Sequence, residues 1–291
     1  MIAYNPPPVQ ELKGSFLDRA GVRVLIRRED LNHPHVSGNK WWKLKYNLGD
    51  AVQLGYRRVL TFGGTYSNHL YATAAAAHEL GLDSVGIVRG EESRPLNSIL
   101  SFARQQQMAL HFISRDDYRK KTDAGFLESL VRTFGEVYII PEGGTNSRAV
   151  KGCAEWGEEL SAIDFDRVCL PVGTGGTISG IVQGLRGQRN VAGYAVLKGG
   201  DFLRDEVRKI THQYGGRNFS NWEIVTRYHF GGYAKSTPEL LQFIGAFENE
   251  YRIPLDPVYT GKMMYGIWDQ LKRNEIPRGT TLLVLHTGGI H

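Results

Sequence analysis

The sequence of 291 residues contains only two cysteines and has neither a long apolar run nor a long basic run. Cys153 and Cys169 are too few and too isolated for a disulfide framework or a zinc site, and each suits a buried position. No segment approaches the ~18 consecutive apolar residues that a membrane-spanning helix needs. The first residues lack the basic flank and apolar stretch of a signal peptide. We therefore expect a cytoplasmic protein without membrane association.

The formal net charge is +5, but the basic residues are scattered among acidic ones. This pattern predicts a mildly basic surface suited to anionic small molecules, and we expect no nucleic-acid partner. The pair His33 and His35 resembles part of a metal site, but no third ligand with suitable spacing lies near it. We expect no bound metal.

Short apolar runs alternate with longer helical patterns along most of the chain. The expected strands are Arg58–Phe62, Ser84–Val88, Ala109–Ile113, Val137–Ile140, Val168–Val172, Ala192–Leu197, Glu223–Thr226 and Thr281–Leu285. The expected helices are Trp41–Leu54, Asn68–Leu80, Leu96–Gln107, Gly125–Phe134, Ser147–Leu160, Ile178–Leu185, Phe202–Tyr214, Pro238–Tyr251 and Lys262–Arg273. This alternation is typical of parallel sheets with helices on both faces, so the fold class is α/β.

Eight expected strands fit one wide sheet or two smaller ones, and the loop at residues 141–146 separates two series of them. We expect two open parallel-sheet domains that share a cleft. Residues 46–146 form the smaller domain, and residues 1–45 with 147–291 form the larger one. Clefts between domains commonly bind small ligands.

A Gly/Thr-rich loop, Gly173–Thr177, connects an expected strand to an expected helix. Backbone N–H groups and hydroxyls at a helix N-terminus form a cradle for phosphate. The loop is not a Walker A motif because no Gly-Lys-Ser/Thr follows it. It is not a dinucleotide fingerprint either, since Ile178 replaces the third glycine and no suitable acidic residue follows. A glycine-rich turn without a ligand is the alternative to a phosphate site.

The segment Ser37–Lys45 contains three lysines beside two adjacent tryptophans. Either Ser37 or Asn39 can cap the following helix, which places Lys40 in its first turn. The positive helix end and partial burial would lower the pKa of Lys40, as a Schiff-base amine requires. Lys43 shares a helix face with Lys40 and could reach a phosphate. The alternative is a solvated helix face with three lysines.

Two further segments carry candidate binding residues. The turn Gly63–His69 leads into an Ala-rich helix, and its helix N-terminus suits a substrate carboxylate. Ser67 and Asn68 could equally be ordinary helix caps. In the segment Asp256–Lys262, Tyr259 is either a core aromatic residue or an acid/base or stacking group beside a ligand.

Taken together, these segments resemble the 1-aminocyclopropane-1-carboxylate deaminase and D-cysteine desulfhydrase family. This family belongs to the tryptophan-synthase-β-like, fold type II, pyridoxal-phosphate enzymes. In chain order, the matching segments are Arg28–Leu31, Ser37–Leu44, Gly63–Asn68, Pro141–Asn146, Gly173–Thr177, Asp256–Lys262 and His286–Gly289. The resemblance spans nearly the whole chain. It implies a homodimer with pyridoxal 5′-phosphate in the cleft between the two domains, acting on a small amino acid.

The resemblance also implies roles for individual residues. Lys40 would form the Schiff base with the cofactor and move the α-proton of the substrate. Ser67 and Tyr259 would act with it as catalytic residues. The other cofactor-binding residues would be Lys43, Asn68, Thr174, Gly175, Gly176, Thr177, Thr260 and Thr287, with both Thr260 and Thr287 at the pyridine nitrogen. The substrate-binding residues would be Ser67, Asn68, His69, Tyr233 and Tyr259.

Two departures from the family pattern bear on the reaction. The ring-opening deaminases carry Glu where this chain has Thr260, and they typically carry Gln where it has His69. A neutral hydroxyl gives a weaker electron sink, which favours β-elimination. We therefore expect D-cysteine to be converted to pyruvate, ammonia and hydrogen sulfide. D-serine, β-chloroalanine and L-cysteine stay open as substrates. The alternatives are a deaminase that releases 2-oxobutyrate and a catalytically inert binding protein.

Overall fold

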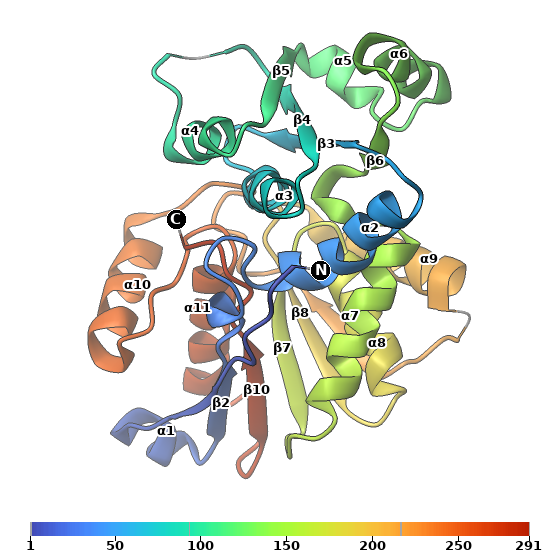
Figure 1. Cartoon of the computed structure of the whole chain (residues 1–291). Coiled ribbons are helices and arrows are strands. Elements are labelled where there is room, and N and C mark those ends of the chain that lie inside the picture. Colours follow the sequence, from blue (N-terminus) through green and yellow to red (C-terminus); the bar gives the residue numbers. More distant parts are fainter. Residues whose placement is uncertain (1, 93, 216, 291) are drawn as a thin grey trace.

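The computed structural model describes residues 2–92, 94–215 and 217–290 and contains two β-sheets with helices packed on both faces (Figure 1). The larger sheet has the strand order β1-β2-β10-β7-β8-β9, and the smaller has the order β5-β4-β3-β6. The strands of the larger sheet are β1 (Val9–Leu12), β2 (Arg23–Arg27), β7 (Arg167–Val172), β8 (Asn190–Ala195), β9 (Trp222–Val225) and β10 (Thr281–Leu285). Those of the smaller sheet are β3 (Arg58–Gly64), β4 (Asp83–Arg89), β5 (Ala109–Ile113) and β6 (Tyr138–Ile140).

The two faces of the larger sheet follow from the two-residue alternation of strand side chains. In β10, Leu283 and Leu285 pack on one face, whereas Leu282 and Val284 pack on the other. The helices that cover the first face are α2 (Asn39–Gln53), α7 (Ser147–Leu160), α8 (Gly176–Leu185) and α9 (Leu203–Gly215). The opposite face is covered by α1 (Ser15–Ala20), α10 (Pro238–Tyr251) and α11 (Thr260–Lys272). Both faces are therefore apolar, as expected for a buried sheet.

The smaller sheet is entirely parallel. Leu60 and Phe62 of β3 pack against α5 (Arg115–Arg119) and α6 (Ala124–Phe134). On the opposite face, Val88 of β4 packs against α3 (Asn68–Glu79) and α4 (Ser98–Gln105). The largest core cluster contains residues of α2 and α3 together with residues of the larger sheet, so one apolar core joins the two sheets.

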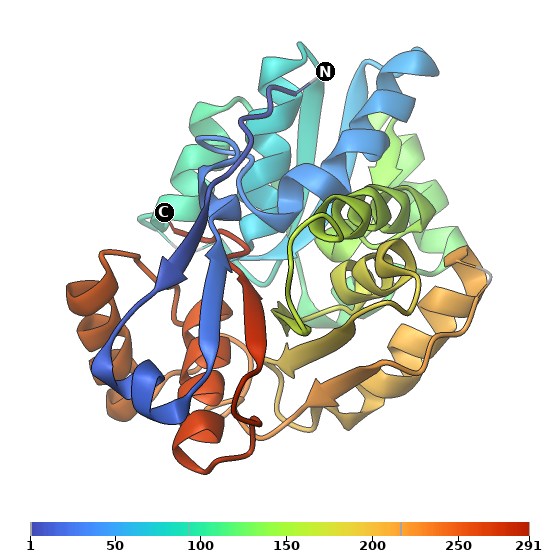
Figure 2. The same ribbon diagram turned by 90° about the horizontal axis from the view of Figure 1, so that it is seen from below.

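All expected strands and helices are present, with shifts of a few residues at their ends. The sequence interpretation missed β1, α1, β2 and α5, as well as short 3-10 helices at Glu29–Leu31, Glu142–Gly144 and Gly200–Phe202. Strand β1 is antiparallel to β2, so the larger sheet is mixed rather than purely parallel. Figure 2 shows β2 (blue) between β1 (dark blue) and β10 (red), so both ends of the chain contribute to one sheet.

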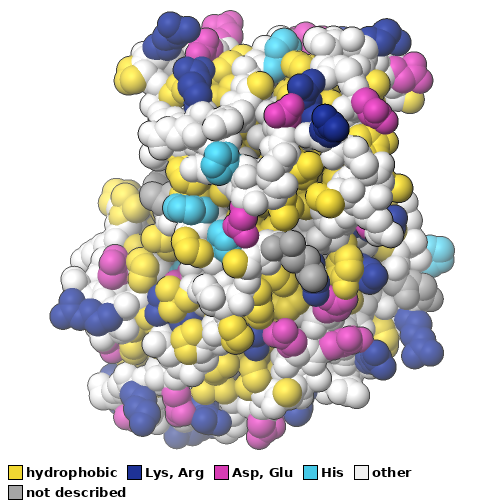
Figure 3. Space-filling view, in the orientation of Figure 1, with side chains coloured by type: hydrophobic (Ala, Val, Ile, Leu, Met, Phe, Trp, Pro, Cys, Tyr) yellow, Lys and Arg dark blue, Asp and Glu magenta, His cyan; other side chains and the backbone are white. Residues whose placement is uncertain are grey.

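The predicted boundary between residues 45 and 46 falls inside α2, and the division into two domains stays a prediction. None of the helices in the described ranges combines the length and apolar character needed to cross a membrane. On the face shown in Figure 3, Lys and Arg side chains lie among Asp and Glu side chains.

Candidate active site

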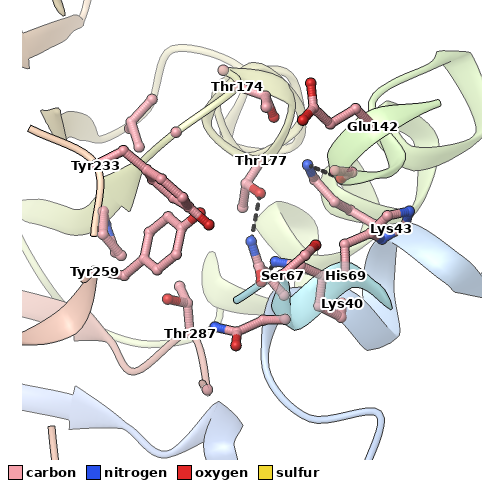
Figure 4. A pocket seen from close by; sticks show the side chains of 18 of the residues that line it. Lys40, Lys43, Ser67, His69, Glu142, Thr174, Thr177, Tyr233, Tyr259 and Thr287 are labelled. Carbon is pink, nitrogen blue, oxygen red and sulfur yellow. Dashed lines mark hydrogen bonds between the residues drawn. The ribbon is translucent and has the colours of Figure 1, made fainter. Parts of the chain in front are cut away.

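A cavity of about 300 Å³ lies where the carboxyl ends of β3, β4, β7 and β10 approach the start of α2. Ligands of open α/β sheets typically bind at such strand ends. Figure 4 shows Lys40, Lys43 and His69 on one side of the cavity, with Tyr233 and Tyr259 on the opposite side. The predicted site residues that line it are Lys40, Lys43, Ser67, Asn68, His69, Thr174, Gly175, Thr177, Tyr233, Tyr259 and Thr287.

The helix that carries Lys40 begins differently from the prediction. Helix α2 starts at Asn39, and neither Ser37 nor Asn39 caps it; its N-cap is Gly38, which forms no side-chain cap. The Asn39 side chain is engaged elsewhere, because its Nδ2 donates to Thr177 Oγ1 (2.9 Å) and its Oδ1 accepts from Lys40 Nζ (2.9 Å). Asn39 therefore links the lysine to the Gly/Thr-rich loop.

Buried hydrogen bonds fix the turn that precedes Lys40 in the chain. The backbone N–H of Gly38 lies 2.8 Å from the carbonyl of Glu29 and 3.0 Å from Asn32 Oδ1. The Glu29 carboxylate accepts hydrogen bonds from Arg27, Asn32 and Trp42 at 2.8, 2.8 and 3.1 Å. Both Glu29 and Asn32 are fully buried, so these bonds are shielded from water.

The two lysines of the cavity are electrostatically perturbed. Burial, followed by the nearby charge of Lys43, lowers the pKa of Lys40 from 10.5 to about 7. Burial also lowers the pKa of Lys43 to about 8. The Nζ of Lys43 donates to the carbonyl of Gly143 (2.8 Å) and to Thr145 Oγ1 (3.2 Å). A substantial fraction of Lys40 is therefore a free amine near neutral pH, as a nucleophilic lysine requires.

The Gly/Thr-rich loop after β7 leads into the N-terminus of α8. Gly175 adopts a left-handed conformation with φ 81°, and α8 begins at Gly176. Thr174 Oγ1 lies 2.8 Å from Thr145 Oγ1, which in turn contacts Lys43. Hydroxyls, a helix N-terminus and a lysine thus converge at one end of the cavity, and this donor set suits a phosphate group.

The turn after β3 also contributes as predicted. Ser67 caps α3, since its Oγ accepts the N–H of Leu70 at 3.3 Å. His69 is buried, and its Nε2 lies 2.8 Å from Thr61 Oγ1. Because the Thr61 hydroxyl donates to the carbonyl of Ile140, we assign the proton of neutral His69 to Nε2. Burial and the charges of Lys40 and Lys43 lower the pKa of His69 well below 6.5.

Two tyrosines form the opposite wall. The rings of Tyr233 and Tyr259 meet edge to face, with centroids 6.1 Å apart. Tyr233 lies on a loop that is held by Lys262 of α11, a lysine that is only 1% exposed. Its Nζ donates to the carbonyls of Gly232 (2.7 Å), His229 (2.9 Å) and Val196 (3.4 Å). Lys262 therefore fastens the Tyr233 loop to the helix that follows Tyr259.

Two predicted cofactor-binding residues do not line the cavity, namely Gly176 and Thr260. The Thr260 hydroxyl is fully buried and donates to Asp256 Oδ2 at 2.8 Å. The Asp256 carboxylate also accepts the N–H groups of Val258, Tyr259 and Thr260. The Thr260 hydroxyl therefore points to Asp256, and its role at the pyridine nitrogen stays a prediction. Thr287 does line the cavity.

The cavity wall also contains residues that the sequence interpretation did not assign to the site. They include Asn39, Arg89, Glu142 and Leu197. Arg89 ends β4 and Glu142 follows β6, so the rule that ligands bind at the carboxyl ends of parallel strands could have indicated both. Within the described ranges, no group of three or more His, Cys, Asp or Glu side chains is arranged to hold a metal ion.

Comparison with known proteins places this arrangement in context. Residues 2–288 match the family model described as pyridoxal-phosphate dependent enzyme. A Pyrococcus horikoshii protein, provisionally named 1-aminocyclopropane-1-carboxylate deaminase, is 32% identical over 292 residues, covering 97% of this chain and 89% of that protein. The mitochondrial bifunctional D-cysteine desulfhydrase/1-aminocyclopropane-1-carboxylate deaminase of Arabidopsis thaliana is 29% identical, covering 99% of this chain and 77% of that protein.

A solved structure gives the same result at the level of the fold. The crystal structure of a homologue of 1-aminocyclopropane-1-carboxylate deaminase superposes with a TM-score of 0.86 at 31% identity. The superposition covers 100% of this chain and 91% of that chain. The expected α/β fold with two sheets is therefore confirmed.

Proposed function

The chain belongs to the family of pyridoxal-phosphate-dependent enzymes, and from that premise we propose that it eliminates the β-substituent of a small amino acid. D-cysteine is the favoured substrate: with one water, it yields pyruvate, ammonia and hydrogen sulfide. When bound, pyridoxal phosphate supplies the electron sink that makes the α-proton of an amino acid acidic.

The donor set of the cavity fits this cofactor. Lys40 supplies an amine whose pKa of about 7 suits both attachment of the cofactor and acceptance of the α-proton. Lys43, Thr174 and Thr177 supply donors for the phosphate, together with the N-terminus of α8. Asn68 is the proposed partner of the ring hydroxyl, and Thr260 and Thr287 stay the proposed partners of the pyridine nitrogen.

The remaining predicted residues face the substrate. We assign the carboxylate to Ser67 and the start of α3, where a helix N-terminus favours negative charge. His69 lies beside Lys40 and Lys43, and Tyr233 and Tyr259 enclose the space on the opposite side. Burial raises the pKa of Tyr259 well above 10, so its phenol keeps its proton and can donate to the departing group.

One observation carries the choice of elimination over ring opening: position 260 bears a neutral hydroxyl that is committed to Asp256. A carboxylic acid at this position would lie against the Asp256 carboxylate. Asp256 itself is saturated by three backbone N–H groups and the Thr260 hydroxyl, so it is not free to meet a ring nitrogen. A neutral partner favours loss of a good leaving group after α-proton removal.

The test is a product assay on the cofactor-loaded enzyme. D-cysteine, L-cysteine, D-serine, β-chloroalanine and 1-aminocyclopropane-1-carboxylate are supplied separately, and sulfide, pyruvate and 2-oxobutyrate are measured. We expect sulfide and pyruvate from D-cysteine, with Lys40→Ala as the inactive control. Dominant release of 2-oxobutyrate from the cyclopropane substrate would instead favour the deaminase, which is the activity in the name of the Pyrococcus relative.

The oligomeric state and cellular location stay predictions. The family resemblance implies a homodimer, which light scattering on the purified protein tests directly. A protein that binds no pyridoxal phosphate and shows no turnover would support the inert alternative.

A further inference from the structure

Arg89 lies at the substrate side of the cavity although no sequence motif indicated it. It is the last residue of β4, and the parallel register of β3 and β4 pairs it with Gly64. Gly64 begins the turn that leads to Ser67 and α3, and both Gly64 and Arg89 line the cavity. Sheet register thus places a guanidinium beside the turn that was assigned to the substrate carboxylate.

The contact between Arg89 and this turn is close. A Cβ atom added to Gly64 would lie 3.3 Å from Arg89 Nη2, so the guanidinium rests against the Gly64 backbone. At the start of α3, the N–H groups of Asn68 and His69 have no hydrogen-bond acceptor among the described residues. Two backbone donors, the Ser67 hydroxyl and a guanidinium therefore share one end of the cavity.

Among the described residues, the charge of Arg89 has no hydrogen-bond or ion-pair partner. Its guanidinium lies 5.5 Å from the ring centroid of Tyr118, but it forms neither a hydrogen bond nor an ion pair with any residue in the described ranges. Glu142, the one described residue of the cavity wall with a side-chain carboxylate, is already bound by the Tyr118 hydroxyl (2.7 Å) and Lys121 (3.5 Å). In Figure 4, Glu142 also lies toward Lys43 and Thr174, at the phosphate-binding end.

The other two cations of the cavity are engaged. Lys43 is held by Gly143 and Thr145, and Lys40 is held by Asn39. Arginine stays protonated throughout the working pH range and presents a planar fork that matches a carboxylate. Arg89 is therefore a permanent charge at an exposed position of the cavity wall, without an ion-pair partner among the described residues, beside a turn whose other donors are uncharged.

We propose that Arg89 determines specificity by binding the α-carboxylate of the substrate against the N-terminus of α3. This inference rests on the proposed function, because it takes an amino acid to be the ligand of that turn. A charge-assisted pair strengthens binding of the carboxylate and excludes amines and esters that lack it. In the described part of the chain, Arg89 forms no hydrogen bond with Lys40 or with the phosphate-binding residues, so we expect the cofactor to attach without it.

The experiment measures ligand binding without turnover. Cofactor-loaded wild type, Arg89→Gln and Arg89→Lys are titrated with D- and L-alanine and with the two alanine methyl esters, and the absorbance of the lysine-bound cofactor is followed. Alanine has no β-leaving group, so failure of the elimination proposal leaves this readout intact. Arg132→Gln is the matched control, since Arg132 is an exposed arginine that does not line the cavity.

We expect Arg89→Gln to weaken binding of the preferred alanine enantiomer about 10- to 100-fold, the range typical of a lost charge-assisted hydrogen bond. The affinity of the same variant for the methyl ester of that enantiomer should change by less than about threefold. The preference for the acid over the ester is therefore largely lost. Arg89→Lys should recover part of the preference because it keeps the charge and loses the fork. Arg132→Gln should bind alanine and its methyl ester with the same affinities as wild type.

Three outcomes would overturn the proposal. Equal weakening of alanine and its ester would show a general disturbance of the site, and an unchanged titration would show that Arg89 does not contact the ligand. A larger loss for the ester than for alanine would place Arg89 at a part of the ligand other than the carboxylate. If Arg89→Gln fails to bind the cofactor, the titration of Arg89→Lys decides. If Arg89→Lys and Arg132→Gln both prefer alanine over its methyl ester as strongly as wild type does, the guanidinium of Arg89 does not bind the carboxylate as a fork.

Discussion

Gly38 packs against the loop after β10, and from this contact we predict that Gly38→Ala lowers both the free energy of unfolding and the binding of the cofactor. A Cβ atom added to Gly38 would lie 1.9 Å from the carbonyl oxygen of Thr287 and 2.7 Å from the backbone nitrogen of Gly288. Both neighbours are backbone atoms, so no side-chain rotation relieves the overlap. An ordinary contact of 3.4 Å requires the two segments to separate by about 1.5 Å.

The expected cost has two parts. Gly38 has φ 69° and ψ −145°, a conformation that residues with a Cβ atom rarely adopt, which costs about 1–3 kcal/mol. The forced separation of packed backbone costs a further ~1–3 kcal/mol. We therefore expect a loss of about 2–6 kcal/mol, and a Tm lowered by roughly 4–12 °C at about 2 °C per kcal/mol for a chain of this size.

The site should suffer as well, because Gly38 precedes Lys40 and the opposing loop carries Thr287. A shift of about 1 Å at an active site can reduce the rate about 100-fold. We expect Gly38→Ala to lose most of the absorbance of lysine-bound cofactor at a cofactor concentration that saturates wild type.

Gly49→Ala is the matched control in the same helix. A Cβ atom at Gly49 meets no atom within 4 Å, and the position is helical. Alanine should therefore raise stability by about 0.5–1 kcal/mol, the opposite sign to Gly38→Ala. Thermal scans at one scan rate and cofactor titrations check both variants. Equal Tm values and equal cofactor binding in the two variants would refute the reasoning.

Two further predictions concern the perturbed lysines. Attachment of the cofactor requires the free amine of Lys40, so the rate at which the cofactor-free protein forms the lysine-bound cofactor should rise as pH increases through about 7. An acidic limb placed above pH 9 would contradict the lowered pKa. In the cofactor-free protein, Lys40 binds more protons in the unfolded chain than in the folded chain between pH 7 and 10.5. The free energy of unfolding should therefore rise with pH in this range, and Lys40→Met should reduce that rise. Lys262→Met removes the three bonds that hold the Tyr233 loop and should lower kcat about 10-fold or more. In a Tyr233→Ala background the same substitution should change kcat by less than about twofold, and an undiminished effect there would show that Lys262 does not act through Tyr233.

The fold was largely predictable because its signals are local. Alternation of apolar runs with helical periods indicated every strand from β3 to β10 and nine of the helices. Strand β2, Arg23–Arg27, was missed because it begins and ends with an arginine, and arginine is typical of exposed segments. In the structure its apolar residues are buried on both faces and its terminal Arg27 is paired with Glu29 and Glu159.

The candidate site was predictable where a motif carries its own chemistry. A lysine after Ser-Gly-Asn and a Gly/Thr loop before a helix indicate an amine and an anion cradle whatever lies around them. Position within a motif did not predict the direction of a side chain. Thr260 belongs to the segment that the resemblance assigned to the cofactor, yet its hydroxyl turns to Asp256 because the carboxylate there needs donors at the start of α11.

The sequence by itself determined the α/β class, the family and the chemical groups available to the site, since each depends on residue types within short segments. The tertiary structure alone decided which groups meet. Parallel register sets Arg89 beside Gly64, and closure of the chain ends into one sheet brings Thr287 against Gly38. Burial among these segments, which the sequence interpretation named beside the helix end, is the largest cause of the lowered pKa of Lys40, and the charge of Lys43 is the second. Contacts between distant segments depend on strand order and packing, and no local pattern encodes them.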